Sequence, residues 1–500
     1  MSDEKKNVSF PELGKEFQVD VGRNLLEIMR TEGIPIRADC GGIGRCNKCI
    51  VTINGKKRRS CRTNVMEDME VIVPPDEAEG FAILLDYEAE DNTIDLEGLG
   101  PLEDLDLAIA VDIGTTTIVG KLLDLKTGSE LSSFAQLNDQ RPYGSDVISR
   151  IEKSLDDASE LSALVKKQID QNILGLIASG KVNASQVKRV VIAGNTTMTY
   201  ILLGLPCRSL GFVPFTPAFT YEVNQTYSEI FGNDNLNCEC TIVPFISAYV
   251  GGDLTAGLCS LGTADDFIIM DMGTNGEMIF KRGDRLICTA TAAGPAFEGG
   301  DIECGSGSTT GAISVVDYEN GEWEIQTIGA SRPTGICGSG ILDLMAVLVK
   351  NKMVDETGLV DKDVIEPPVI LYKDPESDDE VFFTQKDVRQ FQLAKSAVRT
   401  GLEIIMKEMG GEPPAQVFMA GGFGQNLNPQ SAMITGMLPT IFEGRVHAIG
   451  NSSLSGAVKA CLNEEARNGL VEMAAGGQEI NLAAHPLFQD SFMTYMYFEV

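Results

Sequence analysis

The sequence predicts an α/β protein of two unequal parts: a small α+β domain at the amino terminus and a larger body built from two similar halves. Three observations indicate this organisation. Four cysteines lie close together within residues 40–61, and an apolar strand that ends in Asp-x-Gly-Thr occurs twice, 159 residues apart. A stretch with twelve acidic and no basic side chains, residues 76–106, separates the cysteines from the first such strand. At 500 residues, the chain is longer than a single core usually supports.

The net charge and the hydropathy of the sequence argue against nucleic acid and a membrane as partners. The formal net charge of −32 argues against nucleic acid, because an acidic surface repels phosphate. Residues 1–75 hold 13 basic and 11 acidic side chains, so the rest of the chain carries all of the negative excess. No stretch approaches the roughly 18 to 20 apolar residues of a membrane span, and the first residues lack the apolar run of a signal peptide. We therefore expect a cytoplasmic protein with no membrane partner.

The acidic stretch is expected to connect the two parts. Residues 76–106 follow Pro74-Pro75, and like charges along a chain repel one another, which is typical of an extended linker. The alternative is a solvated edge of the second part, on which the apolar residues 81–85 dock.

The cysteines occur in the pattern C-x5-C-x2-C-x11-C, after two short alternating runs and a helical segment at residues 24–31. Four thiolates are what a [2Fe–2S] cluster needs, and the glycines at 41, 42 and 44 allow a loop to wrap it tightly. The alternative is a zinc site with four cysteine ligands. The loop spacing resembles that of the β-grasp ferredoxins, so residues 1–75 are expected to form such a domain. The predicted ligands are Cys40, Cys46, Cys49 and Cys61.

The repeated turn suits a nucleotide. Small residues let backbone N–H groups approach phosphate oxygens, and a carboxylate at the end of a strand can hold hydrated Mg²⁺. Two such turns in two half-domains would clamp Mg²⁺·ATP between them. The predicted residues are Asp112, Gly114, Thr115 and Thr116 in the first turn, and Asp271, Gly273, Thr274 and Asn275 in the second.

A third element, residues 417–424, is a strand that enters a glycine turn, where an adenosine could approach the backbone at Gly421, Gly422 and Phe423. In this order, the three elements resemble the phosphate and adenosine motifs of the actin/Hsp70/sugar-kinase ATPases. The resemblance implies a duplicated, two-lobed ATPase over residues 107–500. Some kinases of this superfold place a catalytic Asp just before the second phosphate turn, which makes Asp253 a candidate to orient the attacking water. The alternative is that Asp253 caps the helix at residues 254–258.

The combination of the two parts resembles the reductive activators of corrinoid proteins, in which a [2Fe–2S] domain precedes an ATPase of this superfold. The segments at residues 289–299 and 384–389 are similar to that family as well. The resemblance implies ATP-dependent reduction of a corrinoid methyl carrier from Co(II) to Co(I). It also implies two partners: the corrinoid protein of a methyltransferase system, and an upstream electron donor, either a ferredoxin or a flavoprotein.

One departure and two alternatives stay open at this point. Some relatives carry a middle domain between the linker and the ATPase, whereas here the first phosphate turn follows the linker almost at once. A homodimer that depends on such a domain is therefore an open question. The first alternative function is an activator of 2-hydroxyacyl-CoA dehydratases, and the second is a non-catalytic redox adaptor that only senses ATP.

Overall fold

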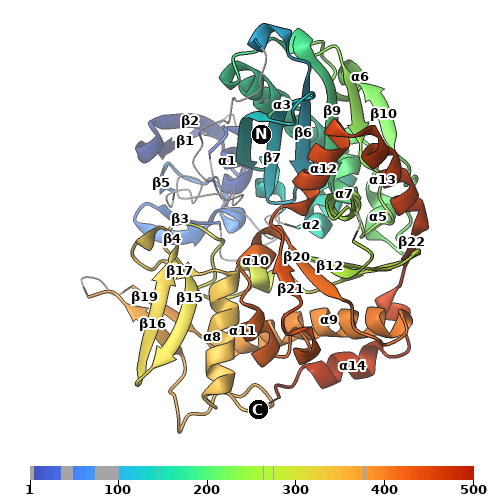
Figure 1. Cartoon of the computed structure of the whole chain (residues 1–500). Coiled ribbons are helices and arrows are strands. Elements are labelled where there is room, and N and C mark those ends of the chain that lie inside the picture. Colours follow the sequence, from blue (N-terminus) through green and yellow to red (C-terminus); the bar gives the residue numbers. More distant parts are fainter. Residues whose placement is uncertain are drawn as a thin grey trace.

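The computed structural model describes residues 5–34, 36, 49–73, 101–144, 146–262, 264–273, 275–375 and 379–499. Figure 1 shows a small amino-terminal domain beside a body of two lobes. The first lobe spans residues 107–262 and the second lobe the described residues from 264 onward. None of the helices formed by the described residues is long and apolar enough to cross a membrane.

The amino-terminal domain is a five-stranded sheet covered by one helix, and it includes the two strands and the helix that the sequence predicts before the cysteines. The strand order is β2-β1-β5-β3-β4, with β1 parallel to β5. Asn24 caps the helix by accepting from the backbone N–H of Leu26 at 3.0 Å, and the helix buries its apolar face on the sheet. The elements are β1 (Lys5–Phe10), β2 (Lys15–Asp20), α1 (Leu25–Thr31), β3 (Ile50–Ile53), β4 (Lys56–Arg59) and β5 (Met69–Ile72).

The first lobe holds a six-stranded sheet of order β10-β11-β9-β6-β7-β8. Its central strand β6 is buried along its whole length, which suits an uninterrupted apolar run. The strands are β6 (Leu107–Ile113), β7 (Thr117–Asp124), β8 (Glu130–Leu137), β9 (Val187–Gly194), β10 (Val223–Thr226) and β11 (Glu239–Ile242). The helices are α2 (Val147–Asp156), α3 (Ala158–Ser179), α4 (Thr196–Leu203), α5 (Arg208–Gly211), α6 (Tyr227–Phe231) and α7 (Gly252–Ser260).

The second lobe repeats the central part of this sheet. In the first lobe, β6, β7 and β8 are antiparallel neighbours and β9 runs parallel to β6. In the second, β12, β13 and β14 are antiparallel neighbours and β20 runs parallel to β12, in the order β21-β20-β12-β13-β14-β22. These strands are β12 (Asp266–Met272), β13 (Gly276–Arg282), β14 (Arg285–Thr291), β20 (Gln416–Ala420), β21 (Val446–Ala448) and β22 (Gly477–Glu479).

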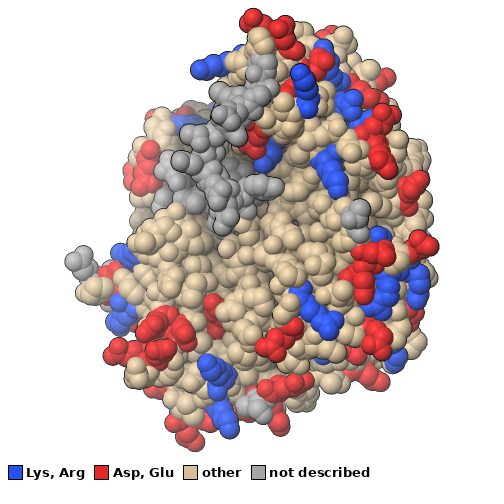
Figure 2. Space-filling view, viewed as in Figure 1, with Lys and Arg blue, Asp and Glu red and all other residues tan. Residues whose placement is uncertain are grey.

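Further elements complete the second lobe. A three-stranded sheet and a two-stranded sheet extend from one side of it (Figure 1), and charged side chains lie mostly toward the rim of the face seen in Figure 2. The strands are β15 (Ala312–Glu319), β16 (Glu322–Thr327), β17 (Gly335–Ile336), β18 (Val369–Lys373) and β19 (Glu380–Phe383). The helices are α8 (Gly338–Lys350), α9 (Gln385–Glu408), α10 (Gly421–Gln425), α11 (Pro429–Ile434), α12 (Ser452–Leu462), α13 (Glu464–Gly476) and α14 (Phe488–Tyr495).

Helices α7 and α12 join the two lobes. Helix α12 follows the second sheet along the chain but packs on β6 and β9 of the first, beside α7 (Figure 1). A side chain at Gly456 would lie 1.8 Å from the carbonyl oxygen of Ala256, so only glycine permits this close crossing. The crossing places the ends of β6 and β12 on either side of one cleft.

The end of the expected linker is anchored on the first lobe. Residues 102–104 form a short 3-10 helix, and Leu105 is buried. The Gln186 side chain donates to the carbonyl oxygens of Leu102 and Leu105 at 2.6 and 3.1 Å. Because of their charge, these residues were expected to belong to the linker. In the structure, the described residues from 102 onward contact the first lobe.

Candidate nucleotide and iron–sulfur sites

A cavity of about 390 Å³ lies between the lobes, a volume that suits a small ligand. Elements from both lobes line it, including the ends of β6, β12 and β20 and the start of α8. The structure therefore brings together predicted residues that are more than 300 positions apart. Those that line the cavity are Asp112, Gly114, Thr115, Thr116, Asp253, Asp271, Gly273, Asn275, Gly421, Gly422 and Phe423. Thr274 lies outside the described residues.

The first turn is held in shape by side chains from outside it. The N–H of Gly114 donates to the carbonyl oxygen of Thr117 at 2.9 Å, and a Cβ at position 114 would lie 2.7 Å from that oxygen. Asn195 donates from Nδ2 to Thr115 Oγ1 at 3.0 Å, and the Asn138 amide donates to the carbonyl oxygen of Gly114 at 2.9 Å. The turn therefore keeps a fixed conformation that a phosphate could approach closely.

Asp112, at the end of β6, accepts two hydrogen bonds from the segment that begins α12. Ser453 Oγ and Asn451 Nδ2 donate to its two carboxylate oxygens at 2.7 and 2.9 Å. Both donors belong to the start of α12, where Asn451 also accepts from the N–H of Leu454 at 2.8 Å. Sequence reasoning missed both residues, although the Asn-Ser-Ser segment is a recognisable helix start.

The second turn brings two carboxylates together. Asp271 on β12 lies directly opposite Glu277 on β13 in the antiparallel pair. A side chain at Gly421, whose φ is +80°, would lie 2.6 Å from Asp271 Oδ1, so the glycine turn after β20 also fits against this carboxylate. Glu277 lines the cavity as well, and sequence reasoning missed it although it ends the same motif.

Four carboxylates of the cavity have raised pKa values. Burial, with Asp271 nearby, raises the pKa of Asp253 to about 7. Burial, with Asp112 nearby, raises the pKa of Asp271 to about 7, and burial raises the pKa of both Glu277 and Asp112 above the ordinary range. Like charges in a desolvated site disfavour ionisation, and a divalent cation would reverse that effect. The residues present therefore fit Mg²⁺ bound with an anionic ligand.

Helix α7 begins at Gly252 with Gly251 as its cap residue, so Asp253 lies within the helix and does not cap it. Asp253 lies in the first turn of α7, and its Oδ1 accepts from the N–H of Leu254 at 2.8 Å. Because one carboxylate oxygen is used at the helix start, the other is available to the cavity. The structure therefore assigns the helix cap to Gly251 instead of Asp253, and Asp253 lines the cavity.

Substituting asparagine for Asp253 is expected to stabilise the protein at high pH. The pKa of the Asp253 carboxyl is higher in the folded chain than in the unfolded chain. This carboxyl therefore contributes its full stabilisation below the unfolded pKa, and the contribution is lost as the pH rises through about 7. Without Mg²⁺ and nucleotide, Asp253→Asn should raise the free energy of unfolding by about 1 kcal/mol or more at pH 8, and by less at pH 5. Thermal denaturation at both pH values measures this, with Asp265→Asn, an exposed aspartate, as control. Equal effects at both pH values would contradict it.

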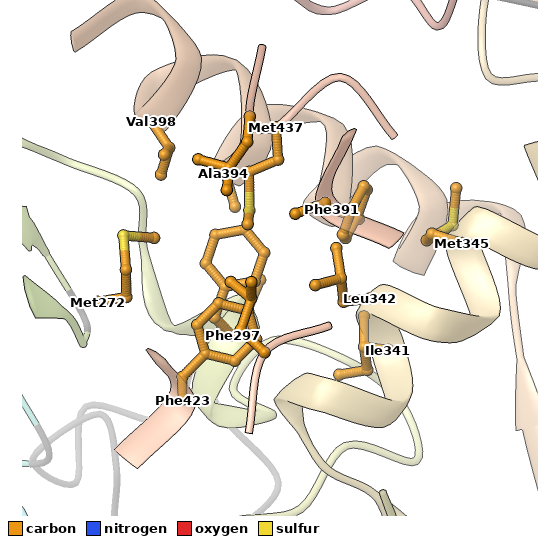
Figure 3. Close-up of a cluster of buried hydrophobic side chains, with 14 of the residues drawn as sticks. Met272, Phe297, Ile341, Leu342, Met345, Phe391, Ala394, Val398, Phe423 and Met437 are labelled. Carbon is orange, nitrogen blue, oxygen red and sulfur yellow. The ribbon is translucent and has the colours of Figure 1, made fainter. Parts of the chain in front are cut away.

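The glycine turn after β20 lines the cavity and also packs into the hydrophobic core of the second lobe. Helix α10 begins directly at Gly421, and the ring of Phe423 stacks on that of Phe297 with the centroids 4.8 Å apart (Figure 3). Phe423 is only 7% exposed and belongs to the core of the second lobe. A side chain at Gly338, the first residue of α8, would lie 1.9 Å from the carbonyl oxygen of Phe297. The turn is thus positioned by aromatic packing that the sequence did not reveal.

Two of the four predicted cluster ligands are described, and they lie together. The sulfur atoms of Cys49 and Cys61 are 3.3 Å apart, which is too long for a disulfide bond, and both side chains are buried. Leu26 of α1 packs against them. Two cysteine sulfur atoms this close, from different segments, fit a shared metal centre. Cys40 and Cys46 lie outside the described residues.

Comparison with known families covers nearly the whole chain. Residues 10–72 match a 2Fe-2S iron–sulfur cluster binding domain, residues 107–265 match the RACo middle region, and residues 265–500 match the C-terminal domain of RACo, the ASKHA domain. The chain belongs to the reductive activators of corrinoid proteins. The first lobe therefore matches the middle region of the corrinoid activators. The sequence suggested that no such region lies between the linker and the ATPase, and this expectation is not supported.

Individual relatives agree with this family. The corrinoid activation enzyme RamQ of Eubacterium limosum is 27% identical over 581 aligned positions, which cover 97% of this chain and 98% of RamQ. The Co(II) methylated amine-specific corrinoid protein reductase of Methanosarcina barkeri is 26% identical, over 73% of this chain and 72% of its own length. A solved reductive activator for corrinoid, iron–sulfur protein superposes with a TM-score of 0.70 at 28% identity, over 99% of this chain and 98% of its own. The predicted fold class is confirmed.

Proposed function

We propose that this protein reduces the cobalt of a corrinoid protein from Co(II) to Co(I) in an ATP-dependent reaction. The observation that carries the proposal is a cleft between two lobes, lined by paired aspartate turns, in a corrinoid-activator chain that begins with an iron–sulfur domain. The relatives in Eubacterium limosum and Methanosarcina barkeri are named for corrinoid activation and for reduction of a Co(II) corrinoid protein. We also propose a cytoplasmic location, because closely spaced cysteines that bind a metal centre suit a compartment in which thiols are kept reduced.

The cleft is assigned to Mg²⁺·ATP. Asp112 and Asp271 face it from the two lobes and would hold the cation between them. The turns at residues 114–116 and 273–275 would bind the phosphates through backbone N–H and hydroxyl groups. Gly421 and Gly422, with Phe423, would contact the adenosine. Asp253 and Glu277 both face the same cavity, and we assign Asp253 to orienting the attacking water because only one of its oxygens is used by the helix.

The iron–sulfur centre is assigned to Cys40, Cys46, Cys49 and Cys61. When bound, a [2Fe–2S] cluster supplies one electron at a time, and the cobalt accepts one electron. An upstream donor, a ferredoxin or a flavoprotein, would replace that electron. The protein's own contribution is to bury Cys49 and Cys61 beneath α1, because a buried, water-poor site keeps the potential low.

ATP is required because the transfer is unfavourable. Plant-type [2Fe–2S] centres have potentials near −400 mV, and the corrinoid couple of this family is expected to lie lower. Since each ~59 mV is a factor of ten for one electron, little Co(I) forms without coupling. Hydrolysis of ATP to ADP and phosphate would open and close the lobes around the cleft and supply the missing free energy.

A steady-state ATPase assay with and without partner proteins tests the assignment of function. We expect hydrolysis by the anaerobically purified chain to rise severalfold when a cognate Co(II) corrinoid protein is added, because the transition state requires the assembled complex. A 2-hydroxyacyl-CoA dehydratase is the matched control and should have no effect. Stimulation by the dehydratase alone would favour the alternative activator, and absence of any hydrolysis would favour an adaptor that only senses ATP.

A further inference from the structure

A three-residue 3-10 helix, residues Arg141–Tyr143, lies between the nucleotide cavity and the iron–sulfur domain. Arg141 lines the cavity. The next two residues contact α1 of the amino-terminal domain: the guanidinium of Arg30 donates to the carbonyl oxygen of Pro142, and its central carbon lies 5.0 Å from the centre of the Tyr143 ring. Adjacent residues of one turn therefore face the two functional parts of the protein.

The Tyr143 ring that contacts Arg30 is held in position by neighbouring side chains. Tyr143 donates from its hydroxyl to Glu160 at 2.9 Å, and Lys153, which pairs with Glu160 at 2.9 Å, lies 5.4 Å from the ring centre. The ring is thereby fixed in place to receive a cation. Burial lowers the pKa of Arg30, and burial together with Glu160 raises the pKa of Tyr143 to about 12, so both groups are partly removed from water. Cation–π contacts strengthen when they are desolvated.

The same short helix is tied to the first phosphate turn. Asn138 donates from its backbone to the carbonyl oxygen of Thr116 and from its side chain to that of Gly114, both at 2.9 Å. The N–H of Arg141 in turn donates to the carbonyl oxygen of Asn138 at 3.0 Å. The turn at residues 114–116 is therefore connected to Arg141 through Asn138.

A second connection runs through Arg150, which is fully buried. Its guanidinium donates to the carbonyl oxygen of Thr115 in the phosphate turn and, through Nε, to that of Gly144 at 3.0 Å. Gly144 is the residue that ends the short helix, where its N–H donates to the carbonyl oxygen of Arg141 at 3.1 Å. The phosphate turn and both ends of residues 141–144 are thus held by one buried hydrogen-bond network.

On the other side, α1 connects Arg30 to the cysteines. Leu26 of this helix packs against Cys49 and Cys61. Asn24, the residue that caps the helix, donates from Nδ2 to the carbonyl oxygen of Cys61 at 3.1 Å. Contacts therefore run without interruption from the phosphate turn to the described cluster cysteines.

We propose that residues Arg141–Tyr143 form a docking site for the iron–sulfur domain that binds Arg30 more tightly when nucleotide fills the cleft. The anionic phosphates would order the turn at residues 114–116 and attract Arg141, which fixes Pro142 and Tyr143 in the conformation that receives Arg30. Because coupling between two sites is reciprocal, docking of the domain must strengthen nucleotide binding by the same factor. The proposal rests on the assignment of ATP to the cleft, but it requires no corrinoid protein.

Nucleotide affinity of the full-length, cluster-containing protein tests this. Isothermal titration with Mg²⁺·ADP and with a non-hydrolysable ATP analogue should show at least fivefold weaker binding for Arg30→Ala and for Tyr143→Ala, within the usual range of coupling. Tyr143→Phe keeps the ring but loses the hydrogen bond to Glu160, so its affinity should lie between those of Tyr143→Ala and the wild type. The matched control is Arg23→Ala, which removes an exposed arginine of the same domain and should bind as the wild type does. An unchanged visible spectrum of the cluster and an unchanged far-ultraviolet circular dichroism spectrum show that the iron–sulfur domain and the body of each variant are folded.

Hydrogen exchange measures the docking itself. Peptides covering α1 and residues 141–144 should become more protected when nucleotide is added to the wild type, and Arg30→Ala should abolish that change. If Arg30→Ala binds nucleotide as tightly as the wild type and exchange does not respond to nucleotide, the coupling is refuted while the ATP site stands. If the wild type itself binds no nucleotide, the ATP site and the coupling are both refuted.

Discussion

Asp271→Asn is expected to reduce ATP hydrolysis by on the order of a hundredfold or more, with little change in the visible spectrum of the cluster. Asparagine keeps the shape of the side chain at the end of β12 but removes the charge that would hold Mg²⁺ against the phosphates, and losing one such electrostatic contact typically costs this much. Asp112→Asn should have a similar effect from the other lobe. Steady-state phosphate release by the anaerobic protein measures both.

The matched control is Asp265→Asn. Asp265 immediately precedes the same strand, is exposed, and pairs with Lys281 at 3.3 Å on the surface, where an ion pair contributes little. It should hydrolyse ATP at the wild-type rate. Full activity in both Asp112→Asn and Asp271→Asn would remove the assignment of the cleft to Mg²⁺·ATP.

Cys61→Ser is expected to abolish cobalt reduction while leaving ATP hydrolysis near the wild-type rate. Cys61 follows β4 in the amino-terminal domain and lies 3.3 Å from Cys49, so a serine there removes one of two adjacent thiolates. Among the described residues, those that line the nucleotide cavity all come from position 112 onward, so the cavity itself should keep its shape in this variant. Iron and acid-labile sulfide content, ATPase rate and Co(I) absorbance measure the three consequences.

Cys304→Ser is the control for this variant, because Cys304 lies in the second lobe. There its sulfur accepts from the N–H of Phe382 at 3.5 Å, which a serine can imitate. It should retain two irons, two sulfides and full cobalt reduction. Cobalt reduction by Cys61→Ser at the wild-type rate would show that the electron does not pass through the centre assigned to these cysteines.

The sequence predicted the elements whose signal is local. Strand ends at Asp112 and Asp271 could be recognised because an apolar run stops at a carboxylate followed by glycine, and the structure places both in one cavity. The two strands and the helix that precede the cysteines, β1, β2 and α1, follow from short-range patterns in the same way.

What the sequence did not reveal depends on contacts between distant segments. Asn451 reaches Asp112 from 339 positions away, and no local pattern indicates that pairing. Phe423 was assigned to the nucleotide from its glycine neighbours, but tertiary packing also stacks it on Phe297. The docking of Arg30 on Tyr143 joins two domains across the linker, which no periodicity encodes.

The central claim is tested most directly by a single-turnover reaction. The full-length protein is reduced anaerobically, separated from the chemical reductant, and mixed with a cognate corrinoid protein in the Co(II) state, and absorbance is followed before and after addition of Mg²⁺·ATP. We predict that Co(I) appears only after ATP is added, in an amount that matches the oxidation of the cluster, one electron per chain. Formation of Co(I) to the same extent without ATP would contradict the account.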